Sequence, residues 1–214
     1  MGKTTGSDLL IRALRAEGVD TVFGIAGDHI LHMLDTMFDA PLRMVDFRHE
    51  SGAVHAADSY SRILKKGAVM LSTTPGHANA LPALANAIHS EAPVINIAGS
   101  AESPNLGRGA MQEFDQINAA KPITKGAWEV PSPSRIPEYV ALAFRTALSG
   151  RQGPVHLTIP HDFQMAEVED AEATRYAPGE YVTPLQVLGD TAQVEKAVDL
   201  LNSAQRPMIF AGSS

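Results

Sequence analysis

The sequence predicts an α/β fold in which a parallel sheet of about six strands is covered by helices on both faces. Two observations predict it. Short apolar runs alternate with longer segments in which apolar residues recur every three or four positions, the spacing of a helix face. The short runs also lack a polar side, and strands that are apolar on both sides are typical of parallel sheets buried between helices.

The first predicted elements are a helix at residues 7–18 and a strand at 19–27. The helix places Leu10 and Leu14 on one face, and Gly18 is a favourable stop signal. The strand is short and ends in glycines. A helix is therefore expected to precede the first strand of the sheet.

The next predicted elements are a helix at residues 28–38, a strand at 42–47 and a helix at 50–64. In the first helix, Met33 and Met37 fall on one apolar stripe. The strand is an apolar run, and the helix after it carries small residues along one side. Small side chains allow another backbone to approach this helix closely.

The remaining part of the sheet follows the same alternation. An apolar strand precedes a helix, a second strand precedes a long loop, and a final helix leads into a final strand. These predicted elements are a strand at 67–74, a helix at 76–90, a strand at 92–100, a helix at 134–150 and a strand at 153–160.

In such a sheet the carboxyl ends of the strands gather at one edge, where ligands bind. The loops expected at this edge are residues 24–29, 47–51, 72–79 and 98–115. The sequence therefore predicts its functional site in these four loops.

The chain is expected to contain more than one domain. Residues 1–163 are predicted to form the α/β domain, and the acidic, aperiodic residues 164–190 a linker. Residues 191–214 read as one helix and one strand, which cannot bury a core of their own. They are interpreted as the truncated start of a second α/β domain.

Composition excludes several classes of function. The chain has 24 acidic and 17 basic residues and no basic block, which argues against nucleic acid or an anionic membrane as a partner. It has no apolar stretch of membrane-spanning length and no cysteine, so a cytoplasmic protein is expected. Its histidines and carboxylates show no metal-binding spacing, and no metal site is expected in this chain.

Glu50 is the most informative polar residue, because it stands where the strand at 42–47 meets the next helix. A glutamate in the first helical turn can simply interact with the helix dipole. Two polar residues, Arg48 and His49, precede it, and small residues beginning with Gly52 follow it. This setting favours a ligand site over a purely structural role.

Four segments, in this order, resemble thiamine-diphosphate-dependent enzymes of the acetolactate synthase and 2-oxo-acid decarboxylase superfamily. They are "TVFGIAGDHILHMLD", "RHESGAVHAADSYSR", "TTPGHANALPALANAIHSEAPVINIAGS" and "GRGAMQEFDQ". The resemblance covers about residues 5–163 and identifies them as the N-terminal, pyrimidine-binding domain. It also implies that residues from 191 onward begin the central domain of that family.

For Glu50 the resemblance implies a proton exchange with ring nitrogen N1′ of the cofactor's aminopyrimidine. A partly desolvated carboxyl is suited to this role. Further cofactor contacts are implied for Ala26, Pro75, Gly76, Asn79 and Gln112. Asp28, His77 and Gln112 are expected near the substrate, although Gln112 fits a polar surface loop equally well.

Ordinary structural roles stay open for several of these residues. Asp28 is a preferred N-cap residue for the helix after it. Pro75 and Gly76 are typical of a turn, and His77 could face solvent. The family usually has glycine where Thr74 stands, so the Thr74 side chain is expected to narrow the pocket.

The resemblance also implies what this chain lacks. The family binds Mg²⁺ and the diphosphate through a Gly-Asp-Gly segment followed by Asn, and no such segment occurs in these 214 residues. The chain alone is therefore expected to be incomplete and inactive, with Mg²⁺ held only by another domain. A 2-oxo acid substrate and a homodimer or homotetramer are implied. The alternative is a non-catalytic dimerising or regulatory module of the same fold.

Overall fold

The computed structural model describes residues 2–169 and 188–212. The chain separates into two compact units, Met1–Tyr181 and Val182–Ser214, which are described separately. Within the described residues, no helix combines the length and apolar character needed to cross a membrane.

The first unit is built on a six-stranded sheet with the order β3-β2-β4-β5-β7-β6, in which every neighbouring pair is parallel. The chain forms β2 first, then β3 on one side of β2, and then β4 on the other side of β2. This reversal between β2 and β4 is the switch point at which parallel sheets bind ligands. The strands are β2 (Thr21–Gly24), β3 (Arg43–Asp46), β4 (Ala68–Ser72), β5 (Val94–Ser100), β6 (Ala127–Glu129) and β7 (Val155–Pro160).

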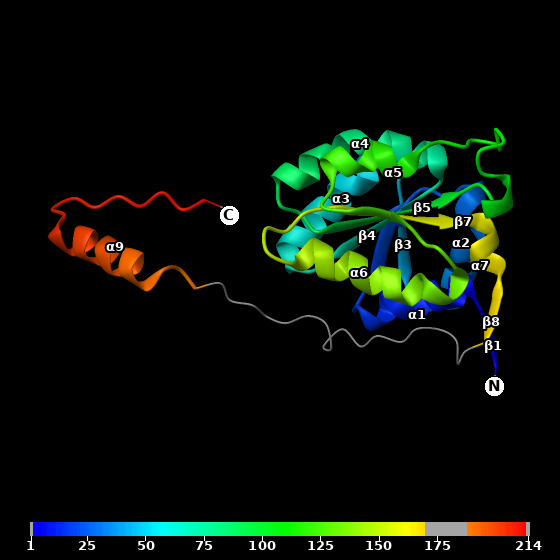
Figure 1. Cartoon of the computed structure of the whole chain (residues 1–214), viewed down its shortest axis with the longest axis horizontal. Coiled ribbons are helices and arrows are strands. Elements are labelled where there is room, and N and C mark those ends of the chain that lie inside the picture. Colours follow the sequence, from blue (N-terminus) through cyan, green and yellow to red (C-terminus); the bar gives the residue numbers. More distant parts are fainter. Residues whose placement is uncertain (1, 170–187, 213–214) are drawn as a thin grey trace. The chain divides into compact units, whose positions relative to one another are not determined.

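Helices cover both faces of the sheet, as predicted (Figure 1). One layer contains α1, α2 and α6, and the opposite layer contains α3, α4 and α5. The helices are α1 (Gly6–Ala16), α2 (Leu31–Phe38), α3 (Glu50–Leu64), α4 (Thr74–His89), α5 (Gln116–Ala120), α6 (Ile136–Leu148) and α7 (His161–Met165).

Each face of the sheet has its own hydrophobic cluster, and the strands supply both by alternation. In β4, Val69 and Leu71 belong to the cluster under α1, α2 and α6, whereas Ala68 and Met70 belong to the cluster under α3 and α4. All four side chains are fully buried or nearly so. The continuous apolar run that predicted a doubly covered strand is thereby explained.

The ends of α3 are fixed by local interactions at the predicted positions. His49 is the N-cap, and its Nδ1 accepts a hydrogen bond of 3.2 Å from the backbone N–H of Ser51. Lys65 ends the helix in the left-handed conformation, with φ of 53°. The helix therefore begins at Glu50, directly after β3 and its short loop.

The region between β5 and α6 contains structure that sequence patterns do not predict. The expected long loop includes α5, the three-residue strand β6 and three short 3-10 turns. A three-residue strand is too short to show a period of two, and β6 gains its hydrogen bonds from β7. The sixth strand of the sheet is thus supplied by this region.

The first unit extends beyond the predicted boundary at residue 163. Gln164 is buried, and β8 (Glu167–Glu169) pairs antiparallel with β1 (Lys3–Thr5). The prediction that residues 164–169 are linker is therefore wrong: residues 164 and 165 belong to α7, and residues 166–169 are hydrogen-bonded to the N-terminal segment. The rest of the predicted linker, apart from residues 188–190, lies outside the described residues.

The second unit contains α9 (Thr191–Ser203), which confirms the predicted helix. The strand expected after it is absent from the described residues 204–212. A strand is stabilised by hydrogen bonds to a neighbouring strand, and the described residues of this unit offer none. Apolar side chains such as Val194, Val198 and Phe210 are exposed here.

Candidate functional site

Glu50 is the first residue of α3, at the carboxyl edge of the sheet, and its side chain faces the first turns of α4. Its Oε2 accepts a hydrogen bond of 3.0 Å from Nδ2 of Asn79. The hydroxyl of Ser51 donates to the backbone carbonyl of Asn79 at 2.6 Å. These two bonds tie the start of α3 to α4 and fix the direction of the Glu50 carboxylate.

Gly76 permits this approach because it has no side chain. A Cβ atom at Gly76 would lie 2.8 Å from Oε1 of Glu50 and 2.9 Å from Cβ of Ser72. Real Cβ atoms do not approach other atoms so closely, so any larger residue would displace the carboxylate. Pro75 and Gly76 belong to the first turn of α4, with Pro75 at a favoured position, and the separate turn expected here was wrong.

The loop after β2 approaches the same region through a second glycine. A Cβ at Gly27 would lie 2.4 Å from Cγ2 of Thr73, the residue that precedes α4. Ala26 and Asp28 flank Gly27 and are exposed. The structure therefore brings Glu50, Gly76 and Asn79 together and places Ala26 and Asp28 on the neighbouring loop.

The predicted capping role of Asp28 is wrong. Asp28 begins a 3-10 turn, Asp28–Ile30, and the N-cap of that turn is Gly27, with no side-chain hydrogen bond. α2 then starts at Leu31, again without a side-chain cap. The Asp28 carboxylate is thus left at the carboxyl edge of the sheet rather than being used by a helix.

The Thr74 side chain is hydrogen-bonded to β5 and α5, and in the described structure no hydrogen bond joins it to Glu50. The side chain is buried, and its hydroxyl donates to the carbonyl of Gly99 at 3.1 Å. The same oxygen accepts a hydrogen bond of 3.0 Å from Nε2 of Gln116 and lies 3.1 Å from Nδ1 of His29. Thr74 therefore anchors the start of α4 to the loop after β2, to β5 and to α5.

His77 is wholly buried, so the solvent-facing position considered for it is wrong. Its Nε2 lies 3.2 Å from the carbonyl of Gln116, and its Nδ1 lies 2.8 Å from Nδ2 of Asn96. Its ring stacks on that of His156, with centroids 3.9 Å apart. Burial lowers the pKa of His77 to about 4, so the imidazole is neutral and structural at neutral pH.

A buried polar cluster continues from His77 across the sheet. Nδ2 of Asn96 also lies 2.9 Å from Nδ1 of His156, whose Nε2 lies 2.8 Å from the hydroxyl of Thr158. That hydroxyl donates to Oε1 of Gln116 at 3.1 Å. Burial and the adjacent His77 lower the pKa of His156 well below its ordinary value. We refer to His77, Asn96, Gln116, His156 and Thr158 as the polar cluster.

The polar cluster was not predicted from the sequence, although the strands carry a signal for it. Asn96, His156 and Thr158 interrupt strands that are otherwise apolar. His156 and Thr158 are two positions apart, so they point to the same face of β7. Paired polar interruptions on one face of a buried strand indicate a hydrogen-bonded cluster.

Gln112 lies apart from Glu50 in an exposed loop, where it adopts a left-handed φ of 59°. The loop is held by Glu113, whose carboxylate accepts hydrogen bonds of 2.5, 3.0 and 3.0 Å from the backbone N–H groups of Gly107, Gly109 and Ala110. These bonds lower the pKa of Glu113. In the described structure, no hydrogen bond joins Gln112 to Glu50, Gly76 or Asn79.

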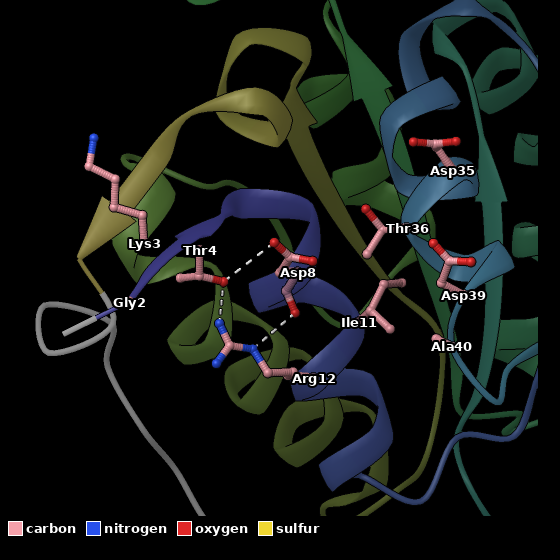
Figure 2. Close-up of a pocket in the computed structure, with 10 residues that line it drawn as sticks. All are labelled: Gly2, Lys3, Thr4, Asp8, Ile11, Arg12, Asp35, Thr36, Asp39 and Ala40. Carbon is pink, nitrogen blue, oxygen red and sulfur yellow. Dashed lines mark hydrogen bonds between the residues drawn. The ribbon is translucent and has the colours of Figure 1, made fainter.

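Two surface cavities lie away from Glu50. One, of about 540 Å³, is lined by residues of the 100–117 region together with Thr74, Glu129 and Thr158. The other, of about 620 Å³, lies beside α1 and α2, where Arg12 bonds to Thr4 and to the carbonyl of Asp8 (Figure 2). None of the predicted cofactor residues lines either cavity. Across residues 2–169 and 188–212, no group of three or more histidines and carboxylates could hold a metal ion.

Comparison with known proteins relates this site to one family. The family described as "Thiamine pyrophosphate enzyme, N-terminal TPP binding domain" matches residues 4–119. The chain is 36% identical to a probable acetolactate synthase large subunit of Methanocaldococcus jannaschii, over 97% of this chain and 35% of that protein. It is 35% identical to oxalyl-CoA decarboxylase of Escherichia coli K12, over 98% of this chain and 38% of that protein.

A solved structure agrees with these relatives. The thiamine diphosphate-dependent 4-hydroxybenzoylformate decarboxylase of Rhodococcus jostii RHA1 superposes with a TM-score of 0.83 at 28% identity, over 95% of this chain and 38% of that chain. The chain thus spans little more than a third of the length of the relatives it matches. It belongs to the thiamine pyrophosphate enzyme family, and it carries the N-terminal TPP-binding domain of that family.

Proposed function

We propose that this chain is the cofactor-activating part of an enzyme that uses thiamine diphosphate to cleave or join 2-oxo acids, with Glu50 as the activating carboxyl. The supporting observation is the convergence of Glu50, Asn79 and Gly76 at the carboxyl edge of the sheet. The printed names of the relatives, acetolactate synthases and decarboxylases, indicate the same chemistry.

The residues around Glu50 fit a planar aminopyrimidine. Gly76 presents bare backbone beside Oε1 of Glu50, and a flat ring requires such a surface. Asn79 occupies Oε2 and leaves Oε1 for a further partner. The half-buried position of Glu50 limits competition by water for that oxygen.

Thiamine diphosphate, when bound, supplies an acidic carbon whose deprotonated form attacks the carbonyl of a 2-oxo acid. Glu50 would act as general acid and base at ring nitrogen N1′, donating or accepting one proton there so that the acidic carbon can lose its own. Asn79 orients the carboxylate, and the polar cluster holds the start of α4, which carries Gly76 and Asn79. The protein's task in this chemistry is therefore orientation and proton control.

Other predicted residues receive more peripheral roles in this proposal. Pro75, next to Gly76, and Ala26, next to Gly27, are proposed to contact the cofactor, and the exposed Asp28 is proposed to lie near the substrate. Gln112 is proposed to act at the site of a neighbouring subunit, because its exposed loop projects from the sheet edge without joining the Glu50 group. His77 is given a structural role only.

We infer that the diphosphate and Mg²⁺ are held by protein outside these 214 residues. No Gly-Asp-Gly segment followed by Asn occurs in the sequence. A homodimer or homotetramer is proposed, as the resemblance to the family implies. The 2-oxo acid itself is recognised in part by those other regions.

The test is Glu50→Gln in the complete enzyme, meaning this chain together with the protein that holds the diphosphate. Glutamine keeps the shape and the hydrogen bond to Asn79 but cannot exchange a proton. We expect exchange of the cofactor's C2 proton to slow by about 100-fold or more, measured by NMR. Glu167→Gln, on the surface strand β8, is the control and should leave exchange unchanged. Unchanged exchange in Glu50→Gln would contradict the proposed function and favour a non-catalytic module.

A further inference from the structure

The hydroxyl of Ser72 is buried without a hydrogen-bond partner in the described structure. Ser72 is the last residue of β4, at the carboxyl edge of the sheet, and its side chain is 0% exposed. A buried hydroxyl that lacks a partner destabilises the folded protein. Alanine would fill this position without that cost, so the hydroxyl calls for a functional explanation.

The Ser72 side chain points toward the Glu50 group. Ala68 and Met70 of β4 belong to the cluster under α3 and α4, and Ser72 follows them with the same alternation. Its Cβ lies 2.9 Å from the point where a Cβ of Gly76 would stand, and Oε1 of Glu50 lies 2.8 Å from that point. Ser72 and Glu50 thus both lie against Gly76.

The two groups complement one another. Oε2 of Glu50 is occupied by Asn79, whereas within the described residues Oε1 makes no hydrogen bond. A serine hydroxyl can donate to a carboxylate or accept from a protonated carboxyl, so it can serve Glu50 in either state.

We propose that Ser72 is a positioning residue for Glu50, with its hydroxyl bonding to Oε1 as the carboxyl turns toward the cofactor ring. The inference rests on the proposed role of Glu50. Ser72 then orients the Glu50 carboxyl from the end of β4, while Asn79 orients it from α4. The burial of an unpaired Ser72 hydroxyl is the stability cost of this arrangement.

The experiment compares Ser72→Ala with Ser7→Ala. Ser7, on α1, is the matched control, because its hydroxyl is also buried and without a partner in the described structure, far along the chain from Glu50. In urea unfolding of the 214-residue chain, both variants should be at least as stable as the wild type. In the complete enzyme, Ser72→Ala should slow C2 proton exchange about tenfold with the cofactor Kd within about twofold, and Ser7→Ala should change neither.

A double-mutant cycle separates positioning from general packing. In a Glu50→Gln background, Ser72→Ala should cause no further slowing, because the carboxyl that it orients is absent. If Ser72→Ala destabilises the chain or fails to fold, the hydroxyl is structural and the inference is overturned. Normal exchange in Ser72→Ala beside slow exchange in Glu50→Gln also overturns it, but leaves the proposed function intact. Normal exchange in both variants removes the proposed function itself.

Discussion

The two faces of the sheet differ in chemistry, although the same strands build both. Toward α1 and α6, the strands β4, β5 and β7 present only apolar side chains, namely Val69, Leu71, Ile95, Ile97, Val155, Leu157 and Ile159. Toward α3, α4 and α5 they present apolar residues such as Ala68, Met70 and Val94 together with buried polar residues, namely Ser72, Asn96, His156 and Thr158.

This difference shows how stability and function are divided within one layer of backbone. The apolar face depends on area and close packing alone. The face toward α3, α4 and α5 has fewer buried apolar side chains and instead contains hydrogen bonds of fixed direction among Asn96, His156, Thr158 and their partners. Those bonds reach Thr74 at the start of α4, which also carries the partners of Glu50.

The largest expected effect comes from a substitution in the hydrophobic cluster under α1, α2 and α6. Leu14 of α1 is fully buried in the cluster under α1, α2 and α6. Leu14→Ala removes buried methyl groups and leaves a cavity, and we expect a loss of about 3–5 kcal/mol in the free energy of unfolding. Urea unfolding at neutral pH measures it. A loss below about 1 kcal/mol would mean that this face is packed too loosely to carry the fold.

The next effect concerns the polar cluster and its response to acid. His77 has a pKa of about 4 when folded and an ordinary value near 6.5 when unfolded. The unfolded chain therefore binds more protons between these values, so stability is full above about pH 6.5 and is lost as pH falls toward 4. The expected loss from His77 alone approaches about 3 kcal/mol, and His156 adds to it in the same direction.

Urea unfolding at several pH values from 7 to 4 tests this difference between the faces. His77→Gln should reduce the pH dependence, because glutamine does not titrate. His55→Gln is the matched control, since His55 is exposed on α3 and should leave the dependence unchanged. If wild type and His77→Gln respond equally to acid, His77 is not held neutral by burial.

Most of the fold could be predicted from the sequence because the apolar face dominates its pattern. Five strands and the helices at α1, α2, α3, α4 and α6 follow from spacing alone. The strands β1, β6 and β8 could not be predicted, since three residues carry no period and their pairing is set by distant partners. Gln164, in the expected linker, is buried by contacts that sequence spacing does not reveal.

Residues of the candidate site that belong to a sequence motif could be predicted to lie together. The directions of side chains that are set by packing could not be predicted. Glu50, Gly76 and Asn79 were expected together, and the structure places them together. His77 belongs to the same motif, yet its ring turns inward to Asn96 and His156, a direction that only the helix geometry of α4 determines. The role of Thr74 likewise depends on Gln116, which lies 42 positions away.

The smallest expected effect comes from a single acidic residue, Glu17, which is partly buried outside the polar cluster. Glu17 is the C-cap residue of α1, and burial raises its pKa to about 7. The folded chain thus binds more protons than the unfolded chain between about pH 4.5 and 7, so Glu17 lowers stability as pH rises through this range. At pH 8 Glu17→Gln replaces a partly buried charge with a neutral amide, and we expect the free energy of unfolding to rise by about 1 kcal/mol. At pH 4 the Glu17 carboxyl is already protonated, so we expect no gain. Urea unfolding at both pH values measures the gain, with Glu195→Gln on exposed α9 as control. Equal effects at the two pH values would show that the Glu17 carboxylate is solvated. A gain confined to pH 8 would show that the charged carboxylate is partly buried without a compensating partner, in contrast to the hydrogen-bonded side chains around His77.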